Sequence, residues 1–173
     1  AAIRGLQFDE QGGLWVATSN GLGYLNKAFN DIKIYKNDPL DPHSLSDDKT
    51  TAIYQDSQNI LWIGTLTNGL NRYDPVTDTF KRFTHQIDNP ASISINRIKS
   101  IYEDRSGILW IGTNGGGLNR YDRLAETFSS LTTRDGLPND VIYGILEDED
   151  SNLWLSTNLG LSRFNPKTGA FKN

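Results

Sequence analysis

The stretch LWIGTNGGGLNRYD, residues 109–122, occurs four times along the chain in slightly different forms. The other copies are LWVATSNGLGYLN at 14–26, LWIGTLTNGLNRYD at 61–74 and LWLSTNLGLSRFN at 153–165. The Trp residues at positions 15, 62, 110 and 154 are therefore 47, 48 and 44 residues apart. A second shared segment precedes each copy, as in IKSIYEDRSG at 98–107. The whole chain is thus four copies of one unit of about 46 residues.

Each unit has the pattern of four short strands separated by turns. In the third copy, the segments 98–103, 109–113, 118–121 and 128–131 are rich in β-branched and aromatic residues, and Gly-containing turns separate them. Four strands in each period of about 40–45 residues are typical of a propeller blade. We therefore predict an all-β fold, a β-propeller with four blades of four antiparallel strands in this chain. The single propeller domain covers residues 1–173, with blades near 1–36, 48–84, 96–132 and 140–173.

Two matched positions fit that architecture. We expect the four Trp side chains to pack between neighbouring blades, because their large apolar area suits an inter-blade core. A stacking platform for bases or sugars is the alternative role for these Trp residues. The first strand of each unit carries a small residue where the crowded centre of a propeller requires one. These small residues are Gly5, Ala52, Ser100 and Gly144.

Composition narrows the class of protein. The chain has 17 Lys plus Arg and 21 Asp plus Glu residues, a formal net charge of −4, so no basic stripe for nucleic acid is expected. It has no Cys, and therefore neither a disulfide framework nor a Cys-based zinc site. No apolar run is long enough to span a membrane, so we expect no membrane contact from this segment. The chain also has no Met, even at position 1, and we expect it to be a section of a longer protein.

The predicted ligand-binding face follows from strand connectivity. Antiparallel strands place the turns between second and third strands on the same face as the long linkers 36–48, 84–96 and 132–140. Binding residues concentrate in loops that a rigid scaffold holds. The candidate ligand-binding residues on this face are Asn20, Asn68, Asn114, Asn158, Lys49 and Arg97.

Each of these candidates has a second possible role. An Asn tolerates left-handed turns and bonds its own backbone, but its amide could also contact sugar hydroxyls. Lys49 and Arg97 begin matched first strands, where they could bind an acidic sugar or remain solvated charges. The sequence leaves both roles open.

No residue pattern points to catalysis. His43 and His85 are the only histidines and do not occupy matched positions, so a symmetric metal cluster is not expected. The segment Gly115–Gly117 has no following Lys or helix, unlike a phosphate-binding loop. The Gly-x-Ser-x-Gly motif of serine hydrolases is absent. We therefore expect no catalytic residue, no metal, no cofactor and a non-covalent function.

Three longer phrases carry a resemblance to a known family. GLNRYDPVTDTFKRF at 69–83, NDPLDPHSLSDDKTTAIYQD at 37–56 and the segment 134–164 resemble two-component regulator propeller repeats. The resemblance implies a periplasmic or other extracytoplasmic sensor region of a bacterial hybrid two-component system or of a related diguanylate-cyclase protein. The motifs do not name the ligand, but relatives often regulate polysaccharide use, so an oligosaccharide or another small molecule is the expected kind of ligand. Two alternatives stay open: an enzyme similar to the streptogramin lyases, which rely on a His base and a divalent metal, and a protein-interaction scaffold.

Four blades are few for a closed ring, and the resemblance implies more. If the ring is open, the first and last blades each expose an apolar sheet face of roughly 300 Å². Exposed apolar faces of that size favour association. We therefore predict that two chains pair into one eight-bladed ring. A closed four-bladed monomer is the alternative.

Overall fold

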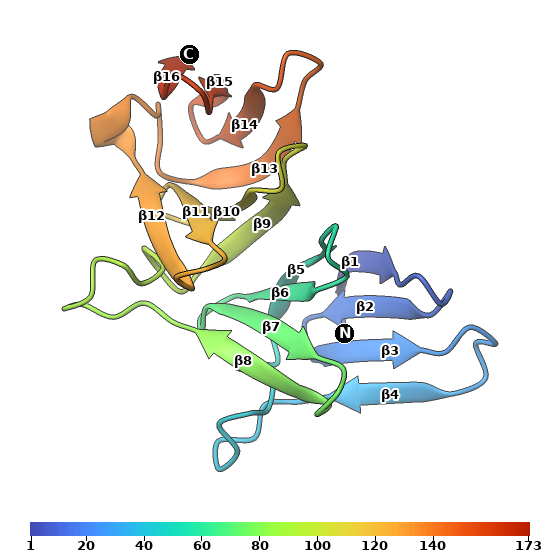
Figure 1. Cartoon of the computed structure of the whole chain (residues 1–173). Coiled ribbons are helices and arrows are strands. Elements are labelled where there is room, and N and C mark those ends of the chain that lie inside the picture. The colour runs from blue at the N-terminus through green and yellow to red at the C-terminus, as the bar shows by residue number, and fades with distance from the viewer.

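The computed structural model describes all residues, 1–173, and contains four antiparallel four-stranded sheets. Figure 1 shows them following one another like blades around a common centre. Blade 1 contains β1 (Ile3–Phe8), β2 (Leu14–Thr18), β3 (Gly21–Leu25) and β4 (Ile32–Tyr35). Blade 2 contains β5 (Thr50–Gln55), β6 (Leu61–Thr65), β7 (Leu70–Asp74) and β8 (Thr79–Phe83). Blade 3 contains β9 (Ile98–Glu103), β10 (Leu109–Thr113), β11 (Leu118–Asp122) and β12 (Thr127–Leu131). Blade 4 contains β13 (Ile142–Glu147), β14 (Leu153–Thr157), β15 (Gly160–Asn165) and β16 (Ala170–Lys172).

The predicted all-β propeller fold, with four strands in every blade, is confirmed. The strands of each sheet are adjacent in chain order, so every blade is a simple meander. The one helical element is a single 3-10 turn, η1 (Thr133–Asp135), in the linker before blade 4. No helix of the fold is long and apolar enough to cross a membrane.

The hydrophobic cores lie between sheets rather than within one. As predicted, Trp15, Trp62 and Trp110 are buried, and each packs against an aromatic ring of the blade that follows. Their partners are Tyr73, Tyr121 and Phe164, with ring centroids 5.0, 5.1 and 5.6 Å away. Blades 1, 2 and 3 are therefore each sealed by the next blade along the chain.

Close approach of neighbouring blades explains two glycines on the second strands. A Cβ atom at Gly64 would lie 2.4 Å from Ile98 Cγ2 of blade 3. A Cβ atom at Gly112 would lie 2.9 Å from Ile142 Cγ2 of blade 4. Both contacts are too short for a larger side chain, so the spacing between blades depends on glycine here.

The linkers are packed on the blade that follows them. The linker 36–48 lays the His43 carbonyl against the backbone N–H of Phe80 in β8, and buries Leu45 completely. Asn71, buried on β7, accepts the Ser46 backbone N–H at 3.0 Å and donates to its hydroxyl at 2.8 Å. The same set recurs one blade later. Its members are Ala91, Phe128, Ile93, Asn119 and Ser94.

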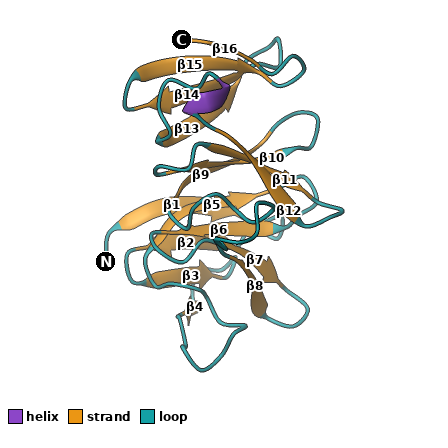
Figure 2. Ribbon diagram, turned by 90° about the vertical axis from the view of Figure 1, so that its left-hand side faces the viewer, coloured by secondary structure: helices purple, strands orange, loops and turns teal.

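The series of blades is not closed into a ring. Figures 1 and 2 place blade 1 and blade 4 at opposite ends of the series. The end face of blade 4 exposes Leu146, its cross-strand neighbour Trp154, which is 39% exposed, and Leu161. The other end face, on blade 1, exposes large apolar side chains of β1 and β4. They are Leu6, Phe8, Ile32 and Ile34. The expectation that an open ring bares two apolar faces is confirmed.

Candidate ligand site

A repeated Asp–Trp pair marks the face that carries the β1–β2 and β3–β4 turns of blade 1 and their counterparts, here called the turn face. An Asp six residues before each Trp caps the first turn with its Oδ1 atom. In blades 2–4 the Oδ2 atom of this Asp accepts the indole N–H of the Trp. The pairs are Asp56–Trp62 at 2.8 Å, Asp104–Trp110 at 2.7 Å and Asp148–Trp154 at 2.9 Å.

Blade 1 departs from this pattern. Its third strand carries Tyr24 where the other blades carry Arg72, Arg120 and Arg163. Tyr24 lies opposite Trp15 on the neighbouring strand, and its hydroxyl donates to Asp9 Oδ2 at 2.9 Å. The indole N–H of Trp15 consequently has no acceptor in the protein, although Trp15 is only 6% exposed.

The junction between blades 2 and 3 is filled on the turn face by an arginine. Arg123 follows Asp122 in the β11–β12 turn and reaches between the two blades. Its guanidinium donates to Asp56 of blade 2 and to Glu103 of blade 3, both at 2.7 Å. The side chains of both carboxylates are almost fully buried, and the arginine neutralises them.

The junction between blades 1 and 2 is instead open. Asp9, Gln55 and Pro75 take the places that Asp56, Glu103 and Arg123 hold at the next junction. Because proline cannot reach across, a cavity of about 520 Å³ remains, which we call the interblade cavity. Such a volume is typical of sites for small molecules. The cavity is lined by Asp9, Glu10, Gln11, Trp15, Tyr24, Asn26, Asp31, Lys33, Tyr35, Gln55, Asn59, Leu61, Tyr73, Pro75 and Asp78.

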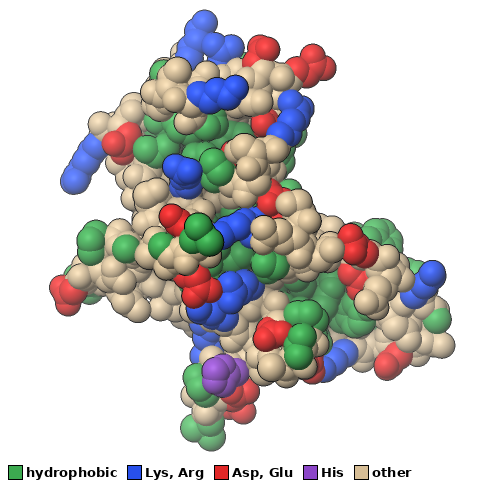
Figure 3. Space-filling view, in the orientation of Figure 1, with side chains coloured by type: hydrophobic (Ala, Val, Ile, Leu, Met, Phe, Trp, Pro, Cys, Tyr) green, Lys and Arg blue, Asp and Glu red, His purple; other side chains and the backbone are tan.

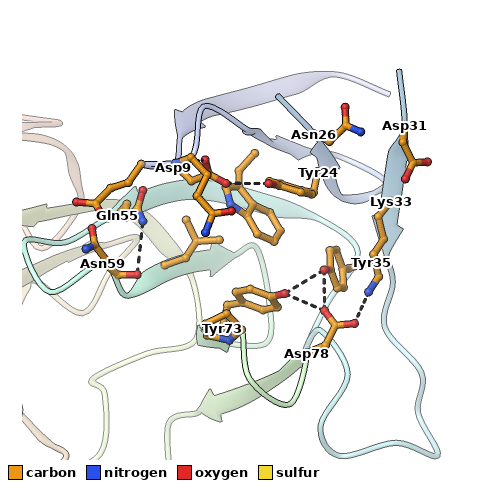
Figure 4. A pocket seen from close by; sticks show the side chains of 15 residues that line it. Asp9, Tyr24, Asn26, Asp31, Lys33, Tyr35, Gln55, Asn59, Tyr73 and Asp78 are labelled. Carbon is orange, nitrogen blue, oxygen red and sulfur yellow. Dashed lines mark hydrogen bonds and ion pairs between the residues drawn. The ribbon is translucent and has the colours of Figure 1, made fainter. Parts of the chain in front are cut away.

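Aromatic rings form one side of the cavity. The Trp15 ring centroid lies 4.6 Å from that of Tyr24, 5.6 Å from that of Tyr35 and 5.0 Å from that of Tyr73. Figure 4 shows amide and carboxylate side chains around these rings, among them Asn26, Gln55 and Asn59. Figure 3 shows hydrophobic side chains between blades 1 and 2, with acidic side chains around them. The cavity thus combines apolar ring surface with convergent polar groups.

A hydrogen-bonded cluster closes the outer end of the cavity (Figure 4). The hydroxyls of Tyr35 and Tyr73 both donate to Asp78 Oδ1 at 2.8 Å, and Lys33 forms an ion pair with Asp78 Oδ2. The Lys33 ammonium also lies 4.6 Å from the Tyr35 ring centroid. Lys33 holds the pKa of Asp78 below its usual value, whereas burial raises the pKa of Tyr24, Tyr35 and Tyr73. Asp78 is therefore ionised and the tyrosines are protonated at neutral pH.

The residues predicted from the sequence lie on the opposite, linker face, apart from this cavity. All four Asn residues lie at turns between second and third strands, and three of their side chains have protein partners. Lys36 donates to Asn20, Asn68 donates to the Ser46 carbonyl at 2.9 Å, and Tyr143 donates to Asn158 at 2.8 Å. The Asn114 side chain makes no hydrogen bond, and Lys49 and Arg97 are exposed without ion pairs. Ligand contact by these six residues stays a prediction.

Neither histidine lies in the interblade cavity. His43 and His85 are in the linkers before blades 2 and 3, and His85 Nδ1 is bonded to the Ile93 carbonyl at 2.9 Å. No group of three or more His, Asp or Glu side chains is arranged to hold a metal ion.

The sequence contains a signal for the cavity that the repeat pattern hides. Comparison of the four units emphasises the residues that they share, such as the Trp and Asn residues. The cavity arises at Tyr24, where the other three units carry Arg, and at Pro75, a turn position that differs among the units. A search for departures from the repeat would have selected Tyr24.

The fold is that of a β-propeller with four blades in this chain, and comparison with known proteins shows what the chain is similar to. Segments 44–67, 92–115 and 136–159 match the two component regulator propeller family model. These three segments are therefore similar to two-component regulator propeller repeats. No curated protein matches its sequence.

Solved structures give a similar result. The chain is similar to the extracellular domain of BT3049 from B. thetaiotaomicron, described as a hybrid two-component system, with 27% identity and a TM-score of 0.85. It has the same identity and TM-score with the corresponding domain of BT4673 from the same organism. The matches cover 99% of this chain but 23% and 24% of those chains, so it spans about a quarter of their length. Virginiamycin B lyase from Staphylococcus aureus, at 16% identity and a TM-score of 0.71, shares the fold over 98% of this chain and 54% of its own.

Proposed function

We propose that this chain is a ligand-binding section of a bacterial extracytoplasmic sensor propeller and that it acts without catalysis. The observation that carries the proposal is the interblade cavity, which is formed entirely by two blades of this chain. The extracellular two-component domains to which the chain is similar support the location and the sensing role. Ligand binding would favour one packing of blades 1 and 2, and a downstream transducer would respond to that shift.

The cavity suits a small polar molecule, and an oligosaccharide end is one such ligand. Aromatic rings provide an apolar surface, while amides such as Asn26 and Gln55 offer both donors and acceptors. The test is isothermal titration calorimetry with a panel of small polar molecules that includes neutral and acidic oligosaccharides. Binding that is lost in a Tyr24→Ala variant, with folding retained by circular dichroism, would support the proposal. Binding that is indifferent to changes in the cavity but lost in an Asn68→Ala, Asn114→Ala double variant would place the ligand on the linker face instead.

We also propose that the two end faces of one chain pack against the end faces of a second copy, so that the two chains complete a ring of eight blades. The Trp154 face of blade 4 corresponds to the faces that Trp15, Trp62 and Trp110 bury against a following blade. The apolar face of β1 and β4 in the second copy would cover Trp154 in place of a following blade. Two such contacts would bury about 1,200 Å² in total, which reaches the lower limit for a specific interface.

Light scattering after size exclusion tests this pairing. We expect a mass near twice 19.4 kDa, and a monomer after Leu6→Glu in the face of blade 1. A stable, soluble monomer at high concentration would refute the pairing.

A further inference from the structure

We propose that the interblade cavity binds a small organic cation of the guanidinium or ammonium type, which takes the place that Arg123 fills one junction further along. This inference rests on the proposed role of the cavity as a ligand site and specifies the chemistry of its ligand. The closest precedent is inside the molecule, because the blade 2–blade 3 junction already holds a guanidinium at the matched place.

The two junctions share the backbone that presents this place. In the β7–β8 turn, Asp74 Oδ1 accepts the Val76 backbone N–H at 2.9 Å. In the β11–β12 turn, Asp122 Oδ1 accepts the Leu124 backbone N–H at the same distance. Pro75 and Arg123 are the residues enclosed by these equivalent turns. The difference between the junctions is therefore one of side chains: the second junction has the Arg123 guanidinium at this place, and the first has no cation there.

The charges around the cavity are unbalanced as a result. Four carboxylates and one ammonium line it, and that ammonium, Lys33, is already paired with Asp78. Asp9, Glu10 and Asp31 have no basic partner. An excess of negative charge around a concave site attracts cations and repels anions.

The aromatic side of the cavity suits the same kind of ligand. Cations are attracted to the faces of Trp and Tyr rings, and the Lys33 ammonium over the Tyr35 ring shows this contact within the cavity. Trp15 lines the cavity, is 94% buried and has an indole N–H without an acceptor. An unpaired donor on a residue that lines the cavity favours a ligand that also carries an oxygen acceptor. The expected ligand is thus a cation with a nearby hydroxyl, carbonyl or carboxyl oxygen.

L-Arginine and L-citrulline provide a matched pair of probes for calorimetry on the intact chain. The two molecules differ at the side-chain terminus, which is a guanidinium in arginine and a neutral urea group in citrulline. We expect arginine to bind with one site per chain and citrulline to bind at least tenfold more weakly. Raising the salt concentration from about 0.05 to about 0.5 M should weaken arginine binding, because screening reduces the attraction.

A variant that supplies the missing cation is the decisive test. Pro75→Arg combined with Gln55→Glu recreates the Arg123 arrangement at the first junction. We expect this double variant to lose arginine binding while its melting temperature stays equal to or above that of the parent. Pro166→Arg is the matched control, because Pro166 occupies the same turn position in blade 4, away from the cavity. It should bind arginine like the parent.

Asp9→Asn tests the central carboxylate with little structural change, since an amide oxygen can still cap the Gln11 and Gly13 backbone N–H groups. We expect at least a tenfold loss of arginine affinity. Equal binding of arginine and citrulline, or undiminished binding to the Pro75→Arg, Gln55→Glu variant, would overturn the inference. An oligosaccharide that binds in the cavity without any arginine binding would overturn the cation inference and leave the proposed function intact. No binding of any probe to the parent chain would contradict both.

Discussion

Trp110 and Trp154 allow the contribution of a neighbouring blade to the unfolding free energy to be measured. Both occupy the same place on the second strand, and both donate to an Asp six residues earlier. Trp110 is 3% exposed because blade 4 covers it, whereas Trp154, on the last blade, is 39% exposed. Replacing each by Ala therefore compares one side chain with and without the blade that seals it.

The expected losses of unfolding free energy differ clearly. Trp110→Ala removes almost a whole buried indole and leaves a cavity between blades 3 and 4, which costs about 3–5 kcal/mol. Trp154→Ala removes a side chain that is already open to water on one side, and no enclosed cavity forms. Its loss should be about 1–2 kcal/mol, since the buried apolar area is smaller and only that area contributes.

Urea unfolding followed by far-ultraviolet circular dichroism at low micromolar chain concentration measures both losses. Circular dichroism is preferred because each substitution removes a fluorophore. Losses that agree within about 0.5 kcal/mol would refute the reasoning that each blade is sealed by the following one. If the chain pairs into a ring, the Trp154→Ala loss should rise towards the Trp110→Ala loss as the concentration increases, because a second copy then covers Trp154.

Three further outcomes are expected. Gly64→Ala should lower the unfolding free energy by about 1–3 kcal/mol, measured by urea unfolding, because its Cβ would overlap Ile98; wild-type stability would contradict the tight blade spacing. Arg123→Met should cost about 3–5 kcal/mol at neutral pH by leaving Asp56 and Glu103 buried without a cation, and a neutral effect would show that the ion pairs matter little. Burial raises the pKa of six tyrosines, so the folded chain holds protons that the unfolded chain releases near pH 10. The stability of the fold should therefore be retained below about pH 10 and fall above it. A melting temperature that rises above about pH 10 would refute this expectation.

The fold was predictable because repetition supplies the same evidence four times. Strand limits predicted for the third unit differ from the observed ones by at most one residue, as at β11 and β12. The burial of the first three Trp residues followed from their size and matched positions. Trp154 was expected to pack between blades as well, but no blade follows it in this chain, so it remains partly exposed.

The interblade cavity was not predicted, for a physical reason. Whether a junction is open depends on side chains from two units that are about 46 residues apart, and neither unit alone reveals it. Asp9 resembles Asp56 in its sequence setting, yet Asp56 is paired with Arg123 and Asp9 has no basic partner. The linker face was predicted from the length of its loops. Loop length gives no information about the opposite face, where Pro75 stands in place of an arginine.

The attachment of each linker to the following blade has a consequence for how such chains can grow or recombine. The unit that can be duplicated begins at the linker rather than at the first strand, because the linker segments around Leu45 and Ile93 are anchored to the blade that follows them. A duplication that starts near residue 36 or 84 would carry a blade together with the linker that packs on it. A duplication that starts at β5 or β9 would carry a blade without the linker residues that bond to its third and fourth strands. Junctions for building chimaeric propellers should therefore be placed at the ends of β4, β8 and β12.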